Sequence, residues 1–542
     1  MAHSSDMAQV RLETVQATST DFLNDTVKRY FNNDSFPQEL ISSDSDQELA
    51  NRLCELPRFS KNYRLELANE IASQYSRAGI ELDKQSEVFR NIERLKDENT
   101  VTVTTGQQIH IFLGPLFVVN KILSCCAETQ ELQLRLPKHQ VVPVFWLASE
   151  DHDFNEIRSA RLYNELYTWD IDSNGPVGRL DPKSILPLVE AAKERIDQTE
   201  ENLAFLEVCQ EAYSHCSTFS DATRRILHTY FEETGIVILD ADSHFLKSQL
   251  RQNIEQDLFH HDNSSAIKQT NSTLKNNKIK PPINTRPINY FMISDTNRNR
   301  IEESENGFHL VGSDQNFTEQ EIRDLIQKAP ESFSPNALIR PVYQQLILPN
   351  WAYVCGGSEF IYWLELKDAT EHAGAVYPRL IIRKSAFFMS QRNASILEDN
   401  DVSFDTLFFN DERFTHVQVS RMNKDYKLVN NQVDSIRTQI GDLITELETR
   451  QKQPINRLKK ASNKLQELFK NEIERTFSNN TRDDTAITRL MKIKNKVWSS
   501  GYVQERNKDI ISSLTEVNLA VKMFKNDYTT FANSREISLL IK

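Results

Sequence analysis

The chain has 542 residues, long enough for two to four domains that each bury their own core. Hydrophobic residues make up 39% and charged residues 26%, as in ordinary globular proteins, and the formal net charge is −13. This acidic balance disfavours a broad nucleic-acid surface, because phosphate binding needs clustered Lys and Arg. The start of the chain has no apolar leader, and no run of about 18 apolar residues occurs. We therefore expect a cytoplasmic protein with no nucleic-acid partner and no membrane span.

Cysteine usage agrees with this expectation. The six cysteines form no CxxC pair and no Cys/His spacing typical of a zinc site. In so long a chain, reduced and buried thiols in the cytoplasm are the expected arrangement. The cysteines are Cys54, Cys125, Cys126, Cys209, Cys216 and Cys355.

The first strong pattern is a strand, a helix and a second strand. Residues 101–104 are β-branched and favour a strand. A turn-rich stretch follows at 105–114, and Pro115 suits the first position of an apolar helix that runs to about Glu131. The nearly continuous apolar run at 141–148 (VVPVFWLA) is typical of a strand covered on both faces. Together these elements predict a right-handed βαβ unit.

A second group of elements follows the same pattern. Residues 235–242 (GIVILDAD) predict a buried strand, and 243–259 predict its following helix. Further strands are predicted at 351–355 and 375–382, with a helix between them at about 358–369. The sequence therefore predicts an α/β fold with a parallel-sheet core.

The predicted core is interrupted twice. Inserted helices are expected at 187–216 and 221–234. The segment 262–306 is rich in Asn, Lys and Ser and has few apolar anchors, so we expect a mobile insertion there. The predicted domain boundaries are 1–160, 235–261 and 307–390 for the core, 161–234 for the helical insertion, 262–306 for the mobile insertion, and 391–542 for a helical coiled-coil domain that returns to the core.

The last third of the chain carries a heptad seam. Its apolar residues step by four, three and four, which predicts a long helical hairpin with coiled-coil character. Two alternatives stay open: the hairpin packs only on itself, or it forms a dimer. The seam consists of Ile436, Ile440, Leu443 and Leu447, and Leu458, Leu465 and Leu468 continue it after Pro454.

The first candidate site follows the first predicted strand. It contains Thr105, Gly106, Gln107 and Gln108, and then Gly114 and Pro115 before the helix. A helix N-terminus at the carboxyl end of a strand can bind an anion, but neither the GxGxxG nor the GxxxxGK[ST] pattern is present. A structural turn therefore stands beside a ligand loop as an interpretation. Lys121 lies among apolar residues and needs an anionic partner.

The second candidate site directly follows the buried run VVPVFWLA. It consists of Glu150, Asp151, His152 and Asp153. Three carboxylates and an imidazole are costly to hold together without a cation, a substrate amine or a shared proton. The alternatives are a solvated acidic turn and a site where Asp or His accepts a proton from an attacking amine. A Mg²⁺ site would also fit oxygen ligands.

The third candidate site combines arginines with paired glycines. Gly356 and Gly357 follow a predicted strand and allow close backbone approach to a ligand. Arg340 and Arg379 are candidates for a bidentate clamp on a carboxylate or phosphate, although either alone is more often a surface ion pair. Cys355 is interpreted as structural, because no neighbouring base is evident.

These blocks, in this order, resemble the bacillithiol biosynthesis cysteine-adding enzyme family, BshC. The resemblance rests on TGQQIHIFLGPLFVVNKILS (105–124), VPVFWLASEDHDFNEI (142–157), SPNALIRPVYQQLILPNWAYVCGGSEFIYW (334–363) and GYVQERN (501–507). It implies a Rossmann-like core related to class I nucleotidyl-transferring synthetases, with helical insertions and a C-terminal α-helical coiled-coil domain associated with dimerisation. It also implies that the chain joins cysteine to glucosaminyl-malate.

The resemblance also marks site residues by position. They are Thr105, Gly106, Gln107, Gln108, Gly114, Pro115, Lys121, Glu150, Asp151, His152, Asp153, Arg340, Gly356, Gly357, Glu359 and Arg379. The chain departs from the family where Asn120 replaces a frequent aromatic residue, and His110 and Cys355 are also atypical. These departures bear on how substrate is recognised.

A mechanism follows as a hypothesis. Because amide formation from a free carboxylate is uphill in water, we expect ATP to activate the cysteine carboxyl as an adenylate or an acyl phosphate. The 105–108 loop and Lys121 would stabilise phosphate charge, the 150–153 cluster would orient or deprotonate the amine, and Arg340 or Arg379 would bind the malate carboxylates. The rival hypothesis is a non-catalytic coiled-coil scaffold with a relic nucleotide-binding core.

Overall fold

The structure is a computed structural model that describes residues 10–33, 36–41, 59–163, 165–422, 424–451, 456–477 and 481–542. The chain divides into two compact units. The core unit comprises Leu23–Ala386 and Glu505–Ser538. The appended unit comprises Met1–Phe22, Phe387–Gln504 and Leu539–Lys542.

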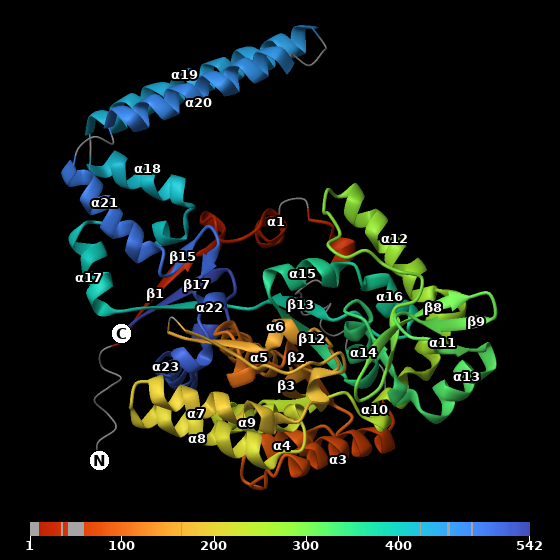
Figure 1. The fold of residues 1–542 in the computed structure, drawn as a ribbon. Helices are drawn as coiled ribbons and strands as arrows, with labels where there is room; N and C mark the ends of the chain where they lie inside the picture. Colours follow the sequence, from red (N-terminus) through yellow and green to blue (C-terminus); the bar gives the residue numbers. More distant parts are fainter. Residues whose placement is uncertain are drawn as a thin grey trace. The chain divides into compact units, whose positions relative to one another are not determined.

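A five-stranded parallel sheet forms the centre of the core unit (Figure 1). Its order is β13 (Arg379–Ile382), β12 (Asn350–Cys355), β2 (Thr100–Gln108), β3 (Gln140–Ala148) and β6 (Val237–Asp240). The chain forms the central strand β2 first, then β3 and β6 on one side of it, and then β12 and β13 on the other side. In such sheets, ligands bind at the carboxyl ends of the strands where the direction of winding reverses, here between β2 and β12.

Strand β2 is longer than the sequence predicts. Residues 105–108 were expected in a turn, but they pair with β3 in register, with Gly106 opposite Trp146 and Gln108 opposite Ala148. The added Cβ of any other residue at Gly106 would lie 3.0 Å from the Cβ of Trp146. Glycine therefore lets the strand continue past a bulky neighbour toward the reversal point.

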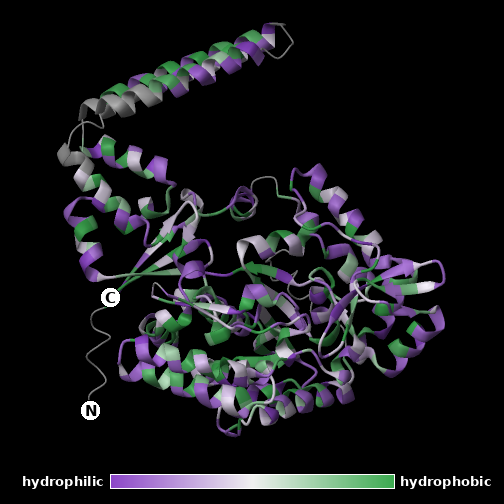
Figure 2. Cartoon of the chain, viewed as in Figure 1, coloured by the Kyte–Doolittle hydropathy of each residue, from purple (hydrophilic) through white to green (hydrophobic). Residues whose placement is uncertain are grey.

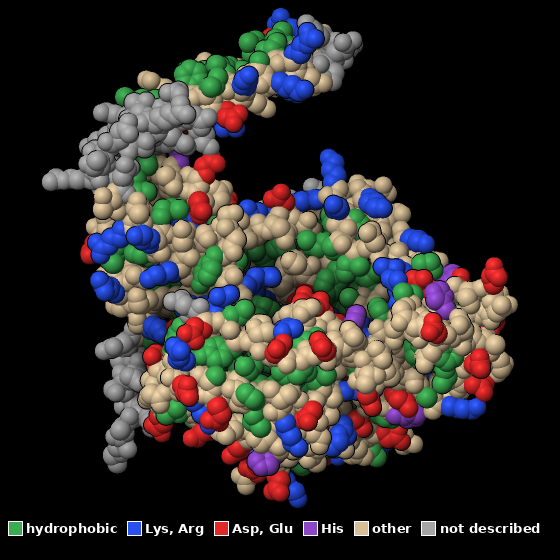
Figure 3. Space-filling model, viewed as in Figure 1, with side chains coloured by type: hydrophobic (Ala, Val, Ile, Leu, Met, Phe, Trp, Pro, Cys, Tyr) green, Lys and Arg blue, Asp and Glu red, His purple; other side chains and the backbone are tan. Residues whose placement is uncertain are grey.

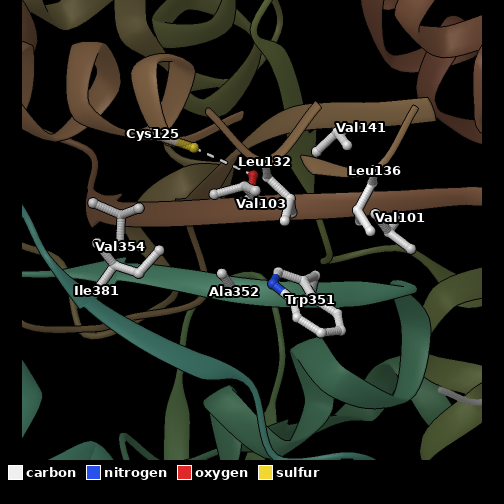
Figure 4. Packing of buried hydrophobic residues seen from close by; sticks show 10 residues of the cluster. All are labelled: Val101, Val103, Cys125, Leu132, Leu136, Val141, Trp351, Ala352, Val354 and Ile381. Atoms are coloured by element: carbon white, nitrogen blue, oxygen red, sulfur yellow. Dashed lines mark hydrogen bonds between the residues drawn. The ribbon is translucent and has the colours of Figure 1, made fainter. Parts of the chain in front are cut away.

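Helix α5 (Phe117–Arg135) crosses one face of this sheet and buries the apolar residues that β2, β3 and β12 turn toward it. Figure 4 shows this packing, in which Cys125 donates from Sγ to the Val103 carbonyl at 3.2 Å. Val103 and Trp351 are buried in the same cluster. Each such side chain contributes about 1.5–3 kcal/mol by leaving water, so this cluster fixes the helix against the sheet.

The insertion between β5 (Glu165–Thr168) and β6 is helical, as predicted. It contains three helices where two helical segments were expected: α7 (Leu186–Arg195), α8 (Glu200–His215) and α9 (Phe219–Phe231). The side chains of Thr199 and Thr218 cap the first turns of α8 and α9. Helix α9 packs beside the edge strand β6, together with α3 (Lys61–Arg77) and α4 (Glu87–Arg94).

The segment 262–306, where a mobile insertion was expected, contains regular secondary structure. It begins with α12 (Asp262–Asn276) and continues into an antiparallel sheet of order β10-β9-β8-β7-β11. Few apolar residues suffice because a buried carboxylate supplies polar contacts: Asp257 accepts hydrogen bonds from the side chains of Asn263 and Asn289. The strands are β7 (Tyr290–Ile293), β8 (Arg298–Ser304), β9 (Gly307–Leu310), β10 (Asn316–Phe317) and β11 (Phe333–Pro335).

Further helices of the core unit link these strands. They are α1 (Asp25–Asn32), α6 (Phe154–Ile157), α10 (His244–Lys247), α11 (Arg251–His260), α13 (Glu319–Lys328), α14 (Ile339–Ile347), α15 (Gly357–Leu364), α16 (Lys367–His372), α22 (Gln504–Asn507) and α23 (Leu514–Asn526). The helix expected after 243 is therefore two helices, and the helix expected at 358–369 is α15 and α16.

The appended unit contains a small sheet and a helical hairpin. The sheet has the order β1 (Arg11–Gln16), β17 (Glu536–Ile541) and β14 (Ser385–Met389). Helices α17 (Gln391–Asp399), α18 (Asp411–Met422) and α21 (Thr481–Lys494) follow. The hairpin pairs α19 (Lys424–Gln451) with α20 (Asn456–Phe477), as the heptad pattern predicts.

The apolar seam of the hairpin is only partly covered. Ile444 is buried, and Ile440 and Leu447 are half-buried. In contrast, Ile436 and Leu443 are 50% and 52% exposed. Leu458, Leu465 and Leu468 are also exposed, and Figure 2 shows hydrophobic residues continuing along both helices. Pro454 lies outside the described residues.

Two other expectations concern cysteines and membranes. The five cysteines among the described residues are buried and form no disulfide, while Cys54 lies outside the described residues. Within the described part of the chain, every helix is too short or too polar to cross a membrane.

Candidate functional site

A cavity of about 680 Å³ opens in the core unit at the carboxyl ends of β2, β3 and β12. Figure 3 shows a hollow on the face turned to the reader, with basic and acidic side chains around it. The antiparallel sheet of the insertion and the returning segment after Gln504 supply further lining residues. The predicted site residues that line the cavity are Gly106, Gln107, Gln108, Lys121, Glu150, Asp151, His152, Arg340, Gly356 and Glu359.

Three predicted residues lie nearby but do not line the cavity. Thr105 donates from Oγ1 to the Val354 carbonyl at 2.8 Å, which ties β2 to β12. Asp153 caps α6, where its Oδ1 accepts from the Glu156 amide at 3.3 Å. Gly357 begins α15. These residues build the frame of the site.

Gly114 and Pro115 hold the returning end of the chain. Gly114 has φ of 71°, and an added Cβ would lie 2.7 Å from the Cβ of His110, so only glycine fits. Its carbonyl accepts from the Ile510 amide at 2.8 Å. Arg506, in the same returning segment, lines the cavity. The sequence analysis did not single it out.

Arg379 is placed away from the cavity. It begins β13, so it lies at the amino end of a parallel strand whose carboxyl end faces the site. There it lines a second cavity of about 340 Å³ with Arg135 and Trp351. The expectation that Arg379 shares a ligand with Arg340 is therefore corrected. The residue at the carboxyl end of this strand is Arg383, which does line the main cavity.

Lys121 has the anionic partner that its sequence setting requires, and that partner is Glu359. The Lys121 ammonium lies 2.6 Å from Glu359 Oε2 and donates to the Gly106 carbonyl at 2.7 Å and to Gln107 Oε1 at 3.2 Å. Burial lowers the pKa of Lys121, and the Glu359 charge opposes this. An ammonium has three donors, and all three are used within the chain. Lys121 therefore joins β2 to α15 and has no donor left for a phosphate.

The Glu359 carboxylate also makes several contacts within the chain. Its Oε2 also accepts from the Gly356 amide at 2.8 Å, and its Oε1 accepts from the Tyr353 hydroxyl at 3.1 Å. Burial would raise the pKa of Glu359, but Lys121 and the Gly356 amide outweigh it and lower the pKa. This carboxylate is an internal counterion that fixes the start of α15.

Unpaired cations face the cavity beyond this pair. Arg340, on α14, is half-buried and lies 3.5 Å from the Tyr362 hydroxyl. Among the described residues, no carboxylate forms an ion pair with Arg340, Arg286 or Arg506, and all three line the cavity. Arg383 differs, because Glu505 binds it through both carboxylate oxygens. The three unpaired guanidinium groups make this wall suitable for an anionic ligand.

Glu150 belongs to a buried ionic network. Lys247 of α10 forms ion pairs with Glu150 and with Asp242, the latter at 3.1 Å. Arg179 binds Asp242 through two hydrogen bonds of 2.7 and 2.9 Å. Burial raises the pKa of Glu150, although Lys247 opposes this. Burial would also raise the pKa of Asp242, but Lys247 and Arg179 lower it to about 2.

Asp151 and His152 lie beside a residue from the insertion. Gln108 donates to Asp151 Oδ2 at 2.8 Å, and Arg298 Nη1 lies 3.0 Å from His152 Nδ1. Burial would raise the pKa of Asp151, but its neighbours, among them the Arg298 charge and the Gln108 hydrogen bond, hold it well below its ordinary range. Asp151 therefore stays ionised at neutral pH.

Residues 177–178 form hydrogen bonds with the loop that carries Asp151 and His152. The sequence analysis did not identify this segment. The Val177 amide donates to the Asp151 carbonyl, and the Gly178 amide donates to the Ser149 carbonyl, both at 2.8 Å. An added Cβ at Gly178 would lie 2.4 Å from the Cβ of Ser149. The glycines of NGPVGR (174–179) were the available signal for this close approach. Arg298 gave no such signal, because it lies in a polar segment without periodicity.

Among the described residues, no group of three or more His, Cys, Asp and Glu side chains is arranged to hold a metal ion. Glu150 and Asp151 instead face Lys247 and Arg298.

Comparison with known proteins identifies the family. The family model for "Bacillithiol biosynthesis BshC, N-terminal Rossmann-like domain" matches residues 10–384. A relative from Flavobacterium johnsoniae, named "Putative cysteine ligase BshC", is 32% identical over 66% of this chain and 66% of its own length. A relative of the same name from Cytophaga hutchinsonii is 30% identical over 86% of this chain and 88% of its own. The chain belongs to the BshC family of bacillithiol biosynthesis.

Proposed function

We propose that this chain is a ligase that joins the carboxyl group of cysteine to the amino group of glucosaminyl-malate, in the last step of bacillithiol biosynthesis. Family membership supports the reaction class. The observation that carries the proposal for this chain is the cavity wall, where Arg340, Arg286 and Arg506 lack ion-pair partners among the described residues. Malate contributes two carboxylates to the acceptor substrate, and bidentate guanidinium groups bind carboxylates well.

The reaction needs an activated cysteine carboxyl. We propose that a carboxylate oxygen attacks a phosphorus atom of ATP, giving an acyl adenylate and pyrophosphate or an acyl phosphate and ADP. The glucosamine amine then attacks the acyl carbon, the carbon–nitrogen bond forms, and AMP or phosphate leaves with the bonding electron pair. The amine releases one proton. Mg²⁺ would arrive with the phosphates, since it is usually held by substrate phosphates and few carboxylates.

We propose different roles for the two acidic residues Glu150 and Asp151 of the cavity. Glu150 is the better proton acceptor, because burial raises the pKa of its carboxyl. Asp151 has a lowered pKa, so it suits a constant negative charge that orients the substrate amine. Asp153 caps a helix and is assigned no chemical step.

The appended unit supports a second proposal, a homodimer in the cytoplasm. Ile436 and Leu443 form one exposed apolar stripe along α19, and Leu458 and Leu465 are exposed on α20. The inner residues Ile440, Ile444 and Leu447 already pack within the hairpin, so the outer stripe is free to pack against a second copy.

Ligand-dependent stability separates the ligase from the rival scaffold. A ligand that binds only the folded protein raises its stability, by about 2.7 kcal/mol at one hundred times its Kd. We expect glucosaminyl-malate, cysteine and ATP to raise the melting temperature of the full chain, and R340M to lose the response to glucosaminyl-malate. No response to any of the three at millimolar concentration would favour the scaffold.

A further inference from the structure

We infer that His152 serves this site as a hydrogen-bond donor through Nε2, and that Arg298 is the positioning residue that fixes this tautomer. The geometry is independent of the substrates, while the chemical role rests on the proposed ligase reaction. The inference departs from the expectation that the imidazole accepts the proton of the attacking amine.

The contact between the two side chains determines where the ring proton lies. Arg298 Nη1 is 3.0 Å from His152 Nδ1. A guanidinium can only donate, so Nδ1 must offer its lone pair. Asp151 Oδ1 is farther from the same nitrogen, at 3.5 Å, and a proton on Nδ1 would point against the Arg298 donor. In the neutral ring the proton is therefore on Nε2.

Arg298 has three further contacts that position it beside His152. Its Nε donates to Ser334 Oγ at 3.0 Å and its Nη2 donates to the Pro335 carbonyl at 2.8 Å. The guanidinium carbon also lies 4.1 Å from the centre of the Phe291 ring. Only 7% of the Arg298 side chain is exposed. Contacts from β7, β8 and β11 thus direct this donor at the imidazole.

His152 is placed to use the remaining N–H. It lines the cavity, and its side chain is 42% exposed while Nδ1 is engaged. When the amine attacks the acyl carbon, the carbonyl π electrons move onto oxygen and return when the phosphate leaving group departs. A neutral imidazole N–H can stabilise that transient negative charge, as donors in oxyanion holes do. The proton released by the amine then passes to Glu150 or to water.

The tautomer can be observed without substrate. In the full chain labelled with ¹⁵N-histidine, long-range ¹H–¹⁵N correlation spectra at neutral pH distinguish a protonated ring nitrogen from an unprotonated one. The His152 signals are those lost in H152Q. We expect protonated Nε2 and unprotonated Nδ1 in the wild type, and an increased share of protonated Nδ1 in R298M. Protonated Nδ1 in the wild type would overturn the inference.

A pair of substitutions tests the chemical role. Glutamine places an amide N–H near the position of Nε2 but cannot act as a base, whereas alanine removes both functions. Because loss of one oxyanion donor costs about 10²–10³-fold in kcat, H152A should fall by that factor with little change in KM, and H152Q should retain at least about a tenth of wild-type kcat. Melting temperatures confirm that both variants are folded.

The outcomes also separate this inference from the proposed function. A wild type that forms no amide from cysteine, glucosaminyl-malate and ATP would refute the proposed reaction, and the tautomer measurement would still decide the Arg298–His152 relationship. If the wild type is active and H152Q is as inactive as H152A, His152 acts as a base and the inference is wrong.

Discussion

Lys121 Nζ lies 2.6 Å from Glu359 Oε2, and both groups make further hydrogen bonds within the chain. Lys121 is 1% exposed and the Glu359 side chain is 20% exposed, so this ion pair lies in the wall of the cavity. It joins the carboxyl end of β2 to the first turn of α15, the two elements that flank the reversal point of the sheet. The pair holds the ligand crevice in shape.

Replacement of Lys121 by methionine should therefore destabilise the protein. K121M leaves Glu359 buried without its counterion, and breaking such a pair typically costs about 3–5 kcal/mol. The double variant K121M/E359Q removes both charges and should lose less than K121M alone. Urea unfolding measures all three proteins. If K121M is as stable as the wild type but inactive, Lys121 binds phosphate, as the sequence analysis expected.

Arg340 and Arg379 provide a test variant and its control. R340M should raise the KM for glucosaminyl-malate by about 10–100-fold, because a charged hydrogen bond contributes about 1.5–3 kcal/mol. R379M should leave KM unchanged, since Arg379 lines the other cavity. Steady-state kinetics on both variants decide the matter, and equal effects would mean that the cavity assignment is incorrect.

Asp257 gives the stability a defined pH dependence. Burial raises its pKa to about 6, above the ordinary value near 3.9. Its contribution to stability is therefore full below the unfolded-state pKa and is lost as pH rises through about 6. D257N has no such titration, so urea unfolding should show that it is more destabilising, relative to wild type, at pH 5 than at pH 7. The same difference at both pH values would contradict a raised pKa.

The outer stripe of the hairpin should control assembly. I436E/L443E places charges on exposed positions and should give a monomer with its helices intact. I444E places a charge at a buried position and should instead unfold the hairpin. Light scattering reports mass, and circular dichroism reports helix content. A wild-type monomer at micromolar concentration would exclude this dimer.

Sequence patterns located the core strands because β3, β6 and β12 are largely apolar and β2 is rich in β-branched residues, as buried parallel strands are. They also located the 150–152 cluster, because polar residues directly follow β3. They could not find Arg298, whose position depends on an antiparallel sheet built from a polar segment. They also could not distinguish Arg379 from Arg383, because that choice depends on where a four-residue strand begins and ends.

The partner of Lys121 shows a similar limit. Its apolar sequence neighbours correctly required an anion, but they could not show whether that anion is a ligand or a carboxylate of the same chain. Glu359 reaches Lys121 only because β12 lies next to β2 in the sheet.

Thiol profiling of a strain that lacks the gene tests the central claim most directly. The proposed ligase predicts that bacillithiol disappears and glucosaminyl-malate accumulates, that the wild-type gene and R379M restore bacillithiol, and that R340M at equal protein level restores much less. Normal bacillithiol in the deletion strain, with no second copy of the gene, would contradict the proposed function.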